Sequence, residues 1–150
     1  MPHRRQRLFG TQSTPPLPSG ESGSIRFVHG VPENFDYDVF VGAVLESVSF
    51  GAYIVHLNFS SEKSSPLYIA VEGTFVHTGP EAEGWEDTVR LPTKSSRLMQ
   101  LTNHLVTAAA RIDQTRMRID FDHGHQLTLL DDTDQYESFQ IKASGRFWVI

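Results

Sequence analysis

The sequence predicts a mainly β (α+β) domain, in which two homologous β-meanders form a sandwich or an open barrel with one short linking helix. The prediction rests on two segments, Val44 to Ser60 and Val106 to Asp122, which align without a gap at a constant offset of 62. In both segments hydrophobic residues alternate with polar ones, as in strands with one buried face. The matching hydrophobic positions are Val55 and Met117, Leu57 and Ile119, and Phe59 and Phe121.

The single duplicated domain is expected to span residues 25–150, after a flexible tail. Residues 1–24 contain four prolines with glycine, serine and threonine, and few large hydrophobic residues. Such a segment cannot bury enough surface to offset the entropy lost on ordering. A short strand is expected over residues 25–31, ended by Pro32. The alternating stretch from Phe35 to Val41 predicts an extended entry into the first repeat.

The first repeat is expected over about residues 42–76. Its predicted strands are residues 44–48, 53–59 and 67–76, with a polar loop at 60–66. Residues 78–88 carry glycine, proline and three glutamates, which predict an exposed excursion from the sheet.

A helix over about residues 93–104 is predicted to link the repeats, because Ser95 or Ser96 can cap it and leucines follow at helical spacing. The leucines are Leu98, Leu101 and Leu105. The second repeat is expected over about residues 105–141. Its predicted features are a turn at 122–125, a polar turn at 131–135, and closing strands at 136–141 and 146–150.

Composition excludes several classes of protein. The chain has no cysteine, which excludes a disulfide scaffold, a thiol nucleophile and a zinc–thiolate site. Its longest hydrophobic runs fall well short of the roughly 20 residues of a membrane span. No stretch has the build of a secretory signal. We therefore expect a cytoplasmic protein without a membrane partner.

The distribution of charge points to the kind of partner. Residues 1–24 carry three arginines against one glutamate, so a total charge of −5 leaves −7 for the rest of the chain. Affinity for nucleic acid comes mainly from lysine and arginine contacts to phosphate, which an acidic body does not supply. We expect no nucleic-acid partner; the acidic body fits either a basic protein partner or simply solubility.

The second repeat resembles part of a known family. The stretch LVTAAARIDQTRMRIDFDHGHQLTLLDDTDQYESFQI contains FDHG at Phe121–Gly124 and YESF at Tyr136–Phe139. These motifs resemble the FDDG…YESW pattern of an uncharacterised family of small bacterial duplicated-β proteins. An earlier, looser copy is IAVEGTF at Ile69–Phe75, and the resemblance covers roughly residues 42–141. The chain departs from the pattern at Phe139, where tryptophan is common, and in its proline-rich amino-terminal extension.

The resemblance implies a duplicated β fold and carries no catalytic residues or activity. Some small proteins of similar build resemble immunity proteins, which bind and block toxins. That link is an analogy at the level of the fold.

The densest acidic stretch is the candidate binding surface. It contains Asp131, Asp132, Asp134, Tyr136 and Glu137. Acidic side chains beside an aromatic one can dock a basic surface, because electrostatics speeds the encounter and the ring supplies contact area. The alternative is a solvated turn with Tyr136 in the core. Trp85 is a second candidate anchor, or a loop tryptophan that folds back on the core.

His123 and His125 flank Gly124 and carry the metal hypothesis. Residues i and i+2 of a strand share a face, so two imidazoles there could meet one metal ion. Zinc sites need three or four ligands, and the alternative is a polar turn with hydrated histidines.

The leading functional prediction is a non-enzymatic protein-binding module, of immunity or inhibitor type, which uses acidic loops against a basic partner such as a toxin domain. No Gly-x-Ser-x-Gly elbow or phosphate-binding glycine loop appears, so no catalytic residue and no cofactor are predicted. A small-ligand or metal-binding β-barrel is the alternative, and a hydrolase with a dispersed site is a third.

Overall fold

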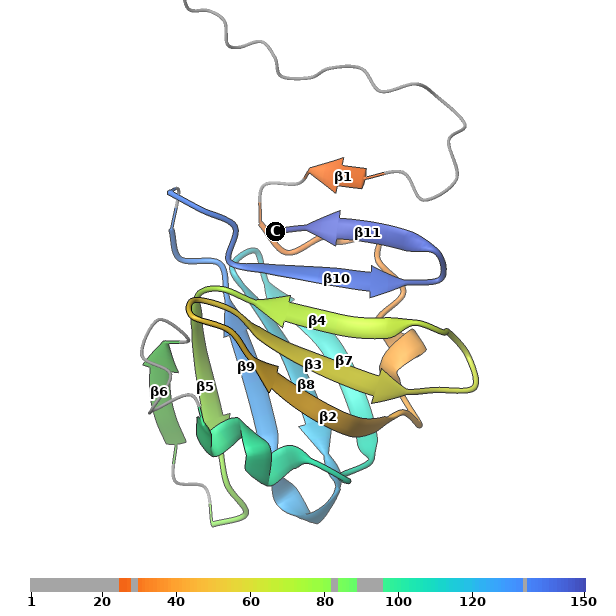
Figure 1. The fold of residues 1–150 in the computed structure, drawn as a ribbon, viewed down its shortest axis with the longest axis vertical. Helices are drawn as coiled ribbons and strands as arrows, with labels where there is room; N and C mark the ends of the chain where they lie inside the picture. Colours follow the sequence, from red (N-terminus) through yellow and green to blue (C-terminus); the bar gives the residue numbers. More distant parts are fainter. Residues whose placement is uncertain (1–24, 28–29, 82–83, 89–95, 134) are drawn as a thin grey trace, which may run out of the picture.

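The computed structural model describes residues 25–27, 30–81, 84–88, 96–133 and 135–150 (Figure 1). Its strands are β1 (Ile25–Phe27), β2 (Val44–Phe50), β3 (Val55–Ser60), β4 (Leu67–Val71), β5 (Thr74–Thr78), β6 (Gly84–Thr88), β7 (Val106–Asp113), β8 (Arg116–Phe121), β9 (Gln126–Leu130), β10 (Phe139–Ala143) and β11 (Arg146–Val149). Three short 3₁₀ helices accompany them: η2 (Tyr37–Phe40), η3 (Ser96–Leu101) and η4 (Asp122–Gly124). The tail predicted at residues 1–24 lies outside the described residues.

The strands form two sheets that face each other as a sandwich. Sheet A has six strands in the order β1-β11-β10-β4-β3-β2, and sheet B has five in the order β6-β5-β9-β8-β7. The pairing is antiparallel throughout except for β1, which lies parallel to β11. Strands of the front sheet cross those of the back sheet steeply (Figure 1), as in orthogonally packed sandwiches. The predicted mainly β sandwich is confirmed.

Each half of the chain contributes to both sheets. The first half places β2, β3 and β4 in sheet A and then the hairpin β5–β6 in sheet B. The second half does the reverse, with β7, β8 and β9 in sheet B and the hairpin β10–β11 in sheet A. The short helices follow the same exchange, since η2 packs against β7 and η3 against β2. Neither half can therefore bury its hydrophobic faces without the other.

The two sheets are joined along one side, where β2 and β7 begin. The Gly42 amide donates to the Val106 carbonyl at 2.9 Å, and the Val106 amide donates to the Ala43 carbonyl at 2.8 Å. Farther along, the Leu45 amide donates to the carbonyl of His104 at 3.1 Å. These bonds pair backbone groups that would otherwise be buried without a partner, and they fix the two first strands against each other.

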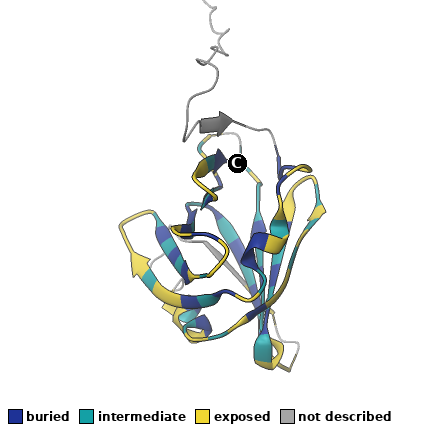
Figure 2. Cartoon of the chain, turned by 90° about the vertical axis from the view of Figure 1, so that its right-hand side faces the viewer, coloured by how far each residue is buried: buried dark blue, intermediate teal, exposed yellow. Residues whose placement is uncertain are grey.

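The core lies between the sheets, where inward residues alternate with outer ones along the strands (Figure 2). All six matched inward positions of the two repeats are buried, with exposed fractions between 0 and 6%. The end of the described chain also belongs to the core, because Trp148, Val149 and Ile150 are 5–9% exposed. The alternation read from the sequence therefore gave the correct buried face.

Three local predictions were wrong. The stretch Phe35–Val41 was expected to be extended, but Tyr37–Phe40 is a 3₁₀ helix. Its start is set by Asp36, whose carboxylate accepts a hydrogen bond from the Asp38 amide at 3.1 Å, and such local bonds turn the chain out of an extended path. The expected excursion at 78–88 contains strand β6, which pairs with β5.

The predicted strand 67–76 breaks at Glu72 and Gly73, where the chain leaves sheet A for sheet B. Gly73 packs against Ser138, since a Cβ there would lie 3.4 Å from Ser138 Cα, an ordinary contact distance. The linking helix, expected at about 93–104, is present as the 3₁₀ helix η3, which ends at Leu101; residues 89–95 lie outside the described part. Leu98 and Leu101 are both fully buried, and their spacing of three matches the three residues per turn of a 3₁₀ helix.

Within the described residues, no helix is long and apolar enough to cross a membrane.

Replacing a central inward residue should destabilise the fold strongly. Leu57 is 0% exposed, so Leu57→Ala should lower the free energy of unfolding by about 2–5 kcal/mol. Met99 is 59% exposed on η3, and Met99→Ala should change it by about 0.5 kcal/mol or less. Urea unfolding of both variants tests this; equal losses would contradict the placement of the core.

Candidate functional site

Three loops meet at one end of sheet A. Val71, the last residue of β4, pairs with Val55 on one side and with Phe139 on the other. Residues 51–54 precede Val55, and residues 131–138 precede Phe139, so both loops lie beside the crossing at Glu72 and Gly73. The Glu72 amide donates to the Ser138 carbonyl at 2.9 Å, which ties two of the loops together. We call residues 51–54, 72–73, 131–133 and 135–138 the acidic rim.

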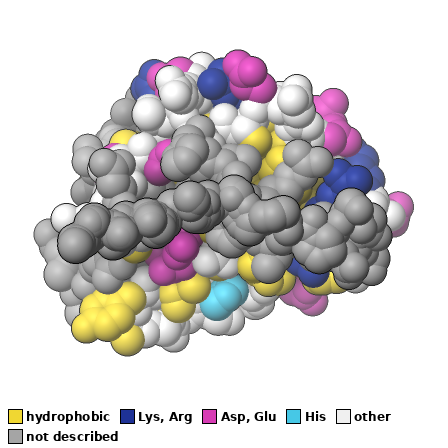
Figure 3. Space-filling model, turned by 90° about the horizontal axis from the view of Figure 1, so that it is seen from above, with side chains coloured by type: hydrophobic (Ala, Val, Ile, Leu, Met, Phe, Trp, Pro, Cys, Tyr) yellow, Lys and Arg dark blue, Asp and Glu magenta, His cyan; other side chains and the backbone are white. Residues whose placement is uncertain are grey.

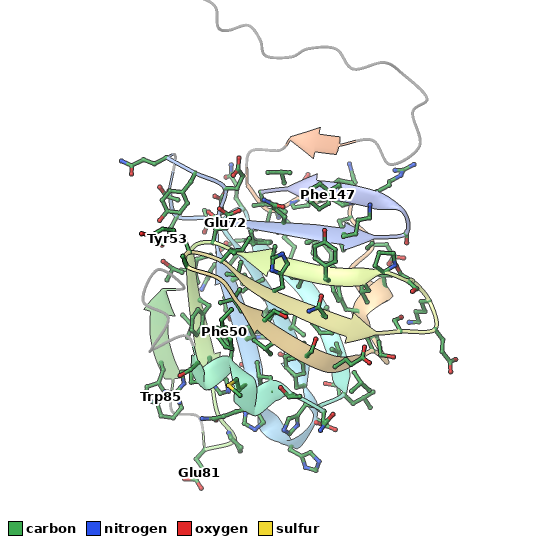
Figure 4. All side chains as sticks on the ribbon, viewed as in Figure 1. Phe50, Tyr53, Glu72, Glu81, Trp85 and Phe147 are labelled. Carbon is green, nitrogen blue, oxygen red and sulfur yellow. The ribbon has the colours of Figure 1, made fainter. Side chains whose placement is uncertain are left out.

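The acidic rim combines acidic side chains with exposed aromatic surface. Its described residues include Glu72, Asp131, Asp132 and Glu137, and they include no lysine, arginine or histidine. Tyr53, at the tip of the β2–β3 turn, is 61% exposed. Figure 4 shows Tyr53 and Glu72 on the same side of the molecule, and Figure 3 shows acidic, basic and hydrophobic side chains on the face seen from above. Such a surface suits a basic partner.

The predicted binding residues differ in how exposed they are in the structure. Asp132 and Glu137 are exposed and free to meet a partner. Asp131 is half-buried, and its Oδ1 accepts a hydrogen bond from Ser138 Oγ at 2.9 Å, so it also holds the loop in place. Tyr136 is likewise half-buried. Asp134 lies outside the described residues.

Trp85 does not belong to the acidic rim. It lies on β6, where it pairs with His77, three residues along β5 from the end that leads to Glu72 (Figure 4). The side chain is 37% exposed, and the guanidinium carbon of Arg97 lies 3.5 Å from the centre of its ring. A cation over an aromatic face at this distance is attractive. Trp85 is therefore partly covered by η3.

A second polar site lies near the opposite end of β5. Four histidines and one aspartate form it, and we call them the histidine cluster: His77, His104, Asp122, His123 and His125. The His104 ring lies 4.8 Å from the His125 ring and 5.6 Å from the His123 ring, centre to centre. The His77 ring stacks on the His125 ring at 5.3 Å. His77 is fully buried, which is unusual for a titratable group and makes its hydrogen bonds informative.

The donor and the acceptor of each hydrogen bond in the cluster can be assigned. Arg97 can only donate, so its Nε, 3.4 Å from His77 Nδ1, makes that nitrogen an acceptor. The ring proton of His77 then sits on Nε2 and is donated to His125 Nδ1 at 3.0 Å. On the other side of the cluster, His104 Nδ1 donates to the carboxylate of Asp122 at 2.6 Å. A cation therefore stands at one end and an anion at the other.

The electrostatics of the cluster follow from this arrangement. Burial lowers the pKa of His125 below its ordinary 6.5, and the nearby His104 and His123 lower it further, against a smaller opposite effect of Asp122. The hydrogen bond from His104 lowers the pKa of Asp122, so the carboxylate stays ionised. The cluster is thus built to hold His125 neutral near neutral pH.

The predicted hairpin turn at residues 122–125 is present, but it does not hold His123 and His125 as neighbours on one strand. His123 has φ 59° and Gly124 φ 83°, so the chain passes through two left-handed residues instead of continuing the strand. A Cβ on Gly124 would lie 3.1 Å from Pro80 Cα, which together with its φ favours glycine. The His123 side chain is 77% exposed, whereas His125 turns inward. The rings of His123 and His125 each contact the ring of His104, and they do not lie side by side on one strand face.

The described positions of these histidines do not provide a set of metal ligands. Among the residues that the structure describes, no group of three or more histidine, aspartate or glutamate side chains is placed to hold a metal ion. A site at His123 and His125 stays a prediction.

His77, His104 and Arg97 were missed by the sequence reading. The alternation of the predicted strand at 67–76, continued by one step from Phe75, places His77 on the buried face, and this signal was available. His104 and Arg97 had no such signal, because their partners lie 18 and 20 residues away along the chain.

Comparisons with protein-family models, with curated protein sequences and with solved structures find no match to this chain. The resemblance of residues 42–141 to the family of small bacterial duplicated-β proteins therefore stays a prediction.

The tautomers of the cluster can be measured. We expect ¹⁵N NMR at pH 7.5 to show the ring proton of His104 on Nδ1 and that of His77 on Nε2, because Asp122 and Arg97 fix them. Asp122→Asn should shift the His104 proton toward Nε2 and leave His77 unchanged. A His104 proton on Nε2 in the unsubstituted protein would contradict the arrangement.

Proposed function

We propose that the protein is a non-enzymatic, cytoplasmic protein-binding module of immunity or inhibitor type. The acidic rim covers a basic surface of a partner protein. The observation that carries this proposal is the convergence of three loops with four described acidic side chains and no described basic one. The immunity role, with a toxin domain as partner, is the specific form that the family resemblance suggests by analogy.

The composition of the rim supports a role in recognition. Exposed charge of one sign raises the rate of encounter with an oppositely charged surface and disfavours other partners. Tyr53 adds an amphipathic ring with a large contact area, and Phe50, 39% exposed, lies next to the same turn. Interfaces gain most of their affinity from a few aromatic or arginine anchors. Tyr53 is the anchor that this surface offers.

The backbone beneath the rim supports a preorganised surface. Ser138 is held on two sides, since its carbonyl accepts from Glu72 and its amide donates to the Ile150 carbonyl at 2.7 Å. The Gly51 amide donates to the Ile54 carbonyl at 2.7 Å and closes the β2–β3 turn. Loops fixed in this way lose little conformational entropy on binding.

Charge reversal at the rim tests the proposal. A double variant with Asp132→Lys and Glu137→Lys should bind the partner about tenfold or more weakly, because two attractions become repulsions. The matched control reverses Glu46 and Glu62, which are exposed at the other end of sheet A and give the same net charge. The three proteins serve as baits in extracts of producing cells, and captured proteins are then titrated by calorimetry at several salt concentrations.

The expected partner binds the unsubstituted protein and the control alike, and its affinity falls with salt, because exposed charges are screened. If no protein is captured at about 0.15 M salt, or if the double variant binds as well as the control, the proposal fails.

Tyr53→Ala should weaken the same complex about fivefold or more, as loss of an aromatic anchor does. Met99→Ala, which removes an equally exposed side chain away from the rim, should leave the affinity within about twofold. Calorimetry with the partner measures both; equal effects would contradict the anchor role of Tyr53.

A further inference from the structure

We propose that the outer face of sheet A binds a neutral polysaccharide, whose sugar rings lie on a row of aromatic side chains. The inference does not rest on the function proposed above. Figure 1 shows sheet A in front, with no other described element drawn over β3, β4 and β10. Five outward side chains on these strands are half-buried and stay within reach of a ligand: His56, Asn58, Tyr68, Gln140 and Lys142.

One row of paired residues crosses the sheet and carries two aromatic rings. Asn58 pairs with Tyr68, Tyr68 with Lys142, and Lys142 with Phe147. The centre of the Tyr68 ring lies 6.4 Å from that of Phe147 and 5.8 Å from that of His56. The three rings therefore form a continuous line over β3, β4 and β11, which we call the aromatic row. Figure 4 labels Phe147 at one end of it.

A short side chain lies beneath the aromatic row. Ala70 faces away from the core, yet it is only 1% exposed. Its partners in the neighbouring strands are His56 and Gln140, and Tyr68 precedes it by two residues on the same face of β4. These longer side chains cover Ala70 and pack over it. Rings that are supported in this way lose little conformational freedom when a ligand stacks on them.

Two amide side chains flank the aromatic row and are held in fixed orientations. The amide nitrogen of Asn58 donates to Ser47 Oγ at 3.2 Å. The amide nitrogen of Gln140 donates to the carboxylate of Glu72 at 3.0 Å. Each of these bonds uses one N–H, and an amide also has a second N–H and a carbonyl oxygen. Both side chains can therefore donate to one hydroxyl group of a ligand and accept from another.

The charges beside the aromatic row offset each other. Lys142 supplies a positive charge, with its Nζ 5.7 Å from the centre of the Phe147 ring, and Glu72 supplies a negative one next to Gln140. Nucleic acids bind mainly through several lysine and arginine contacts to phosphate, which this face does not offer. The large hydrophobic residues that the described chain exposes, which would anchor a protein partner, all lie outside β3, β4, β10 and β11.

A neutral sugar matches this combination of groups. One face of a sugar ring carries C–H groups, which pack against the electron-rich face of an aromatic ring. Its hydroxyl groups both donate and accept hydrogen bonds, as the two amides require. Sites for single small molecules enclose roughly 70–90% of the ligand, whereas an open sheet face contacts it on one side only. The ligand must therefore gain affinity from several linked units, which makes it a polysaccharide.

Electrophoresis of the full chain through gels that each contain one soluble polysaccharide tests the inference. The neutral probes are hydroxyethyl cellulose, laminarin, galactomannan and glycogen, and dextran sulfate is the charged one. At least one neutral probe should retard the protein, and calorimetry with that probe then gives the affinity. Tyr68→Ala should weaken binding about tenfold or more, because it removes the central ring. Tyr53→Ala is the matched control, which removes a tyrosine outside the aromatic row and should leave the affinity within about twofold.

If Tyr68→Ala does not fold, the double variant with Asn58→Ala and Gln140→Ala decides, because it removes both amides and leaves the rings in place. It should also weaken binding about tenfold or more. The inference is overturned if no neutral probe retards the protein, or if the folded variants bind as Tyr53→Ala does. Retardation by dextran sulfate alone overturns it too, since that would show attraction between charges and not recognition of sugar rings.

Discussion

The exchange of hairpins between the two sheets is the constraint on which the rest of the structure depends. After β4 the chain crosses at Glu72 and Gly73 into sheet B, and after β9 it crosses back through residues 131–138. The Glu72–Ser138 hydrogen bond locks the two crossings against each other. Because each hairpin completes the sheet of the other half, the buried faces of both halves form together. A fold of this kind has one core, and its cooperativity comes from the crossings.

The crossings also determine where polar and charged residues lie. Where a chain leaves a sheet, its backbone groups need new partners and its side chains face water, so turn-forming and charged residues accumulate. Both crossings lie at the same end of sheet A, and their acidic side chains form one surface there. The β8–β9 turn lies away from them and carries the histidine cluster. The two candidate sites are thus separate consequences of one topology.

The sequence predicted correctly which face of the strands is buried, but it predicted poorly which strands pair with each other. The period of two identified Leu57, Ile119 and the other inward residues, because burial of one face imposes that period locally. It could not reveal the break after Val71, since the alternation continues in phase from β4 to β5 and only Gly73 marks the crossing. The exchange of hairpins leaves no local trace either. The contact of His77 with His125 depends on that long-range arrangement, because β5 pairs with β9 of the other half, and for this reason His77 was not recognised from the sequence.

The two halves tie a loop to a short helix in different ways. Lys63 lies in the loop between β3 and β4, and His125 lies in the turn between β8 and β9. The first half also ties its loop to a short helix, since Lys63 Nζ donates to the Asp38 carbonyl of η2 at 3.0 Å. The second half makes the corresponding tie to η3 through His125, His77 and Arg97. Lysine stays charged through neutral and mildly acidic pH, whereas histidine changes its charge there. The loop after β3 is thus tied to a short helix through a lysine, and the turn after β8 through histidines and Arg97.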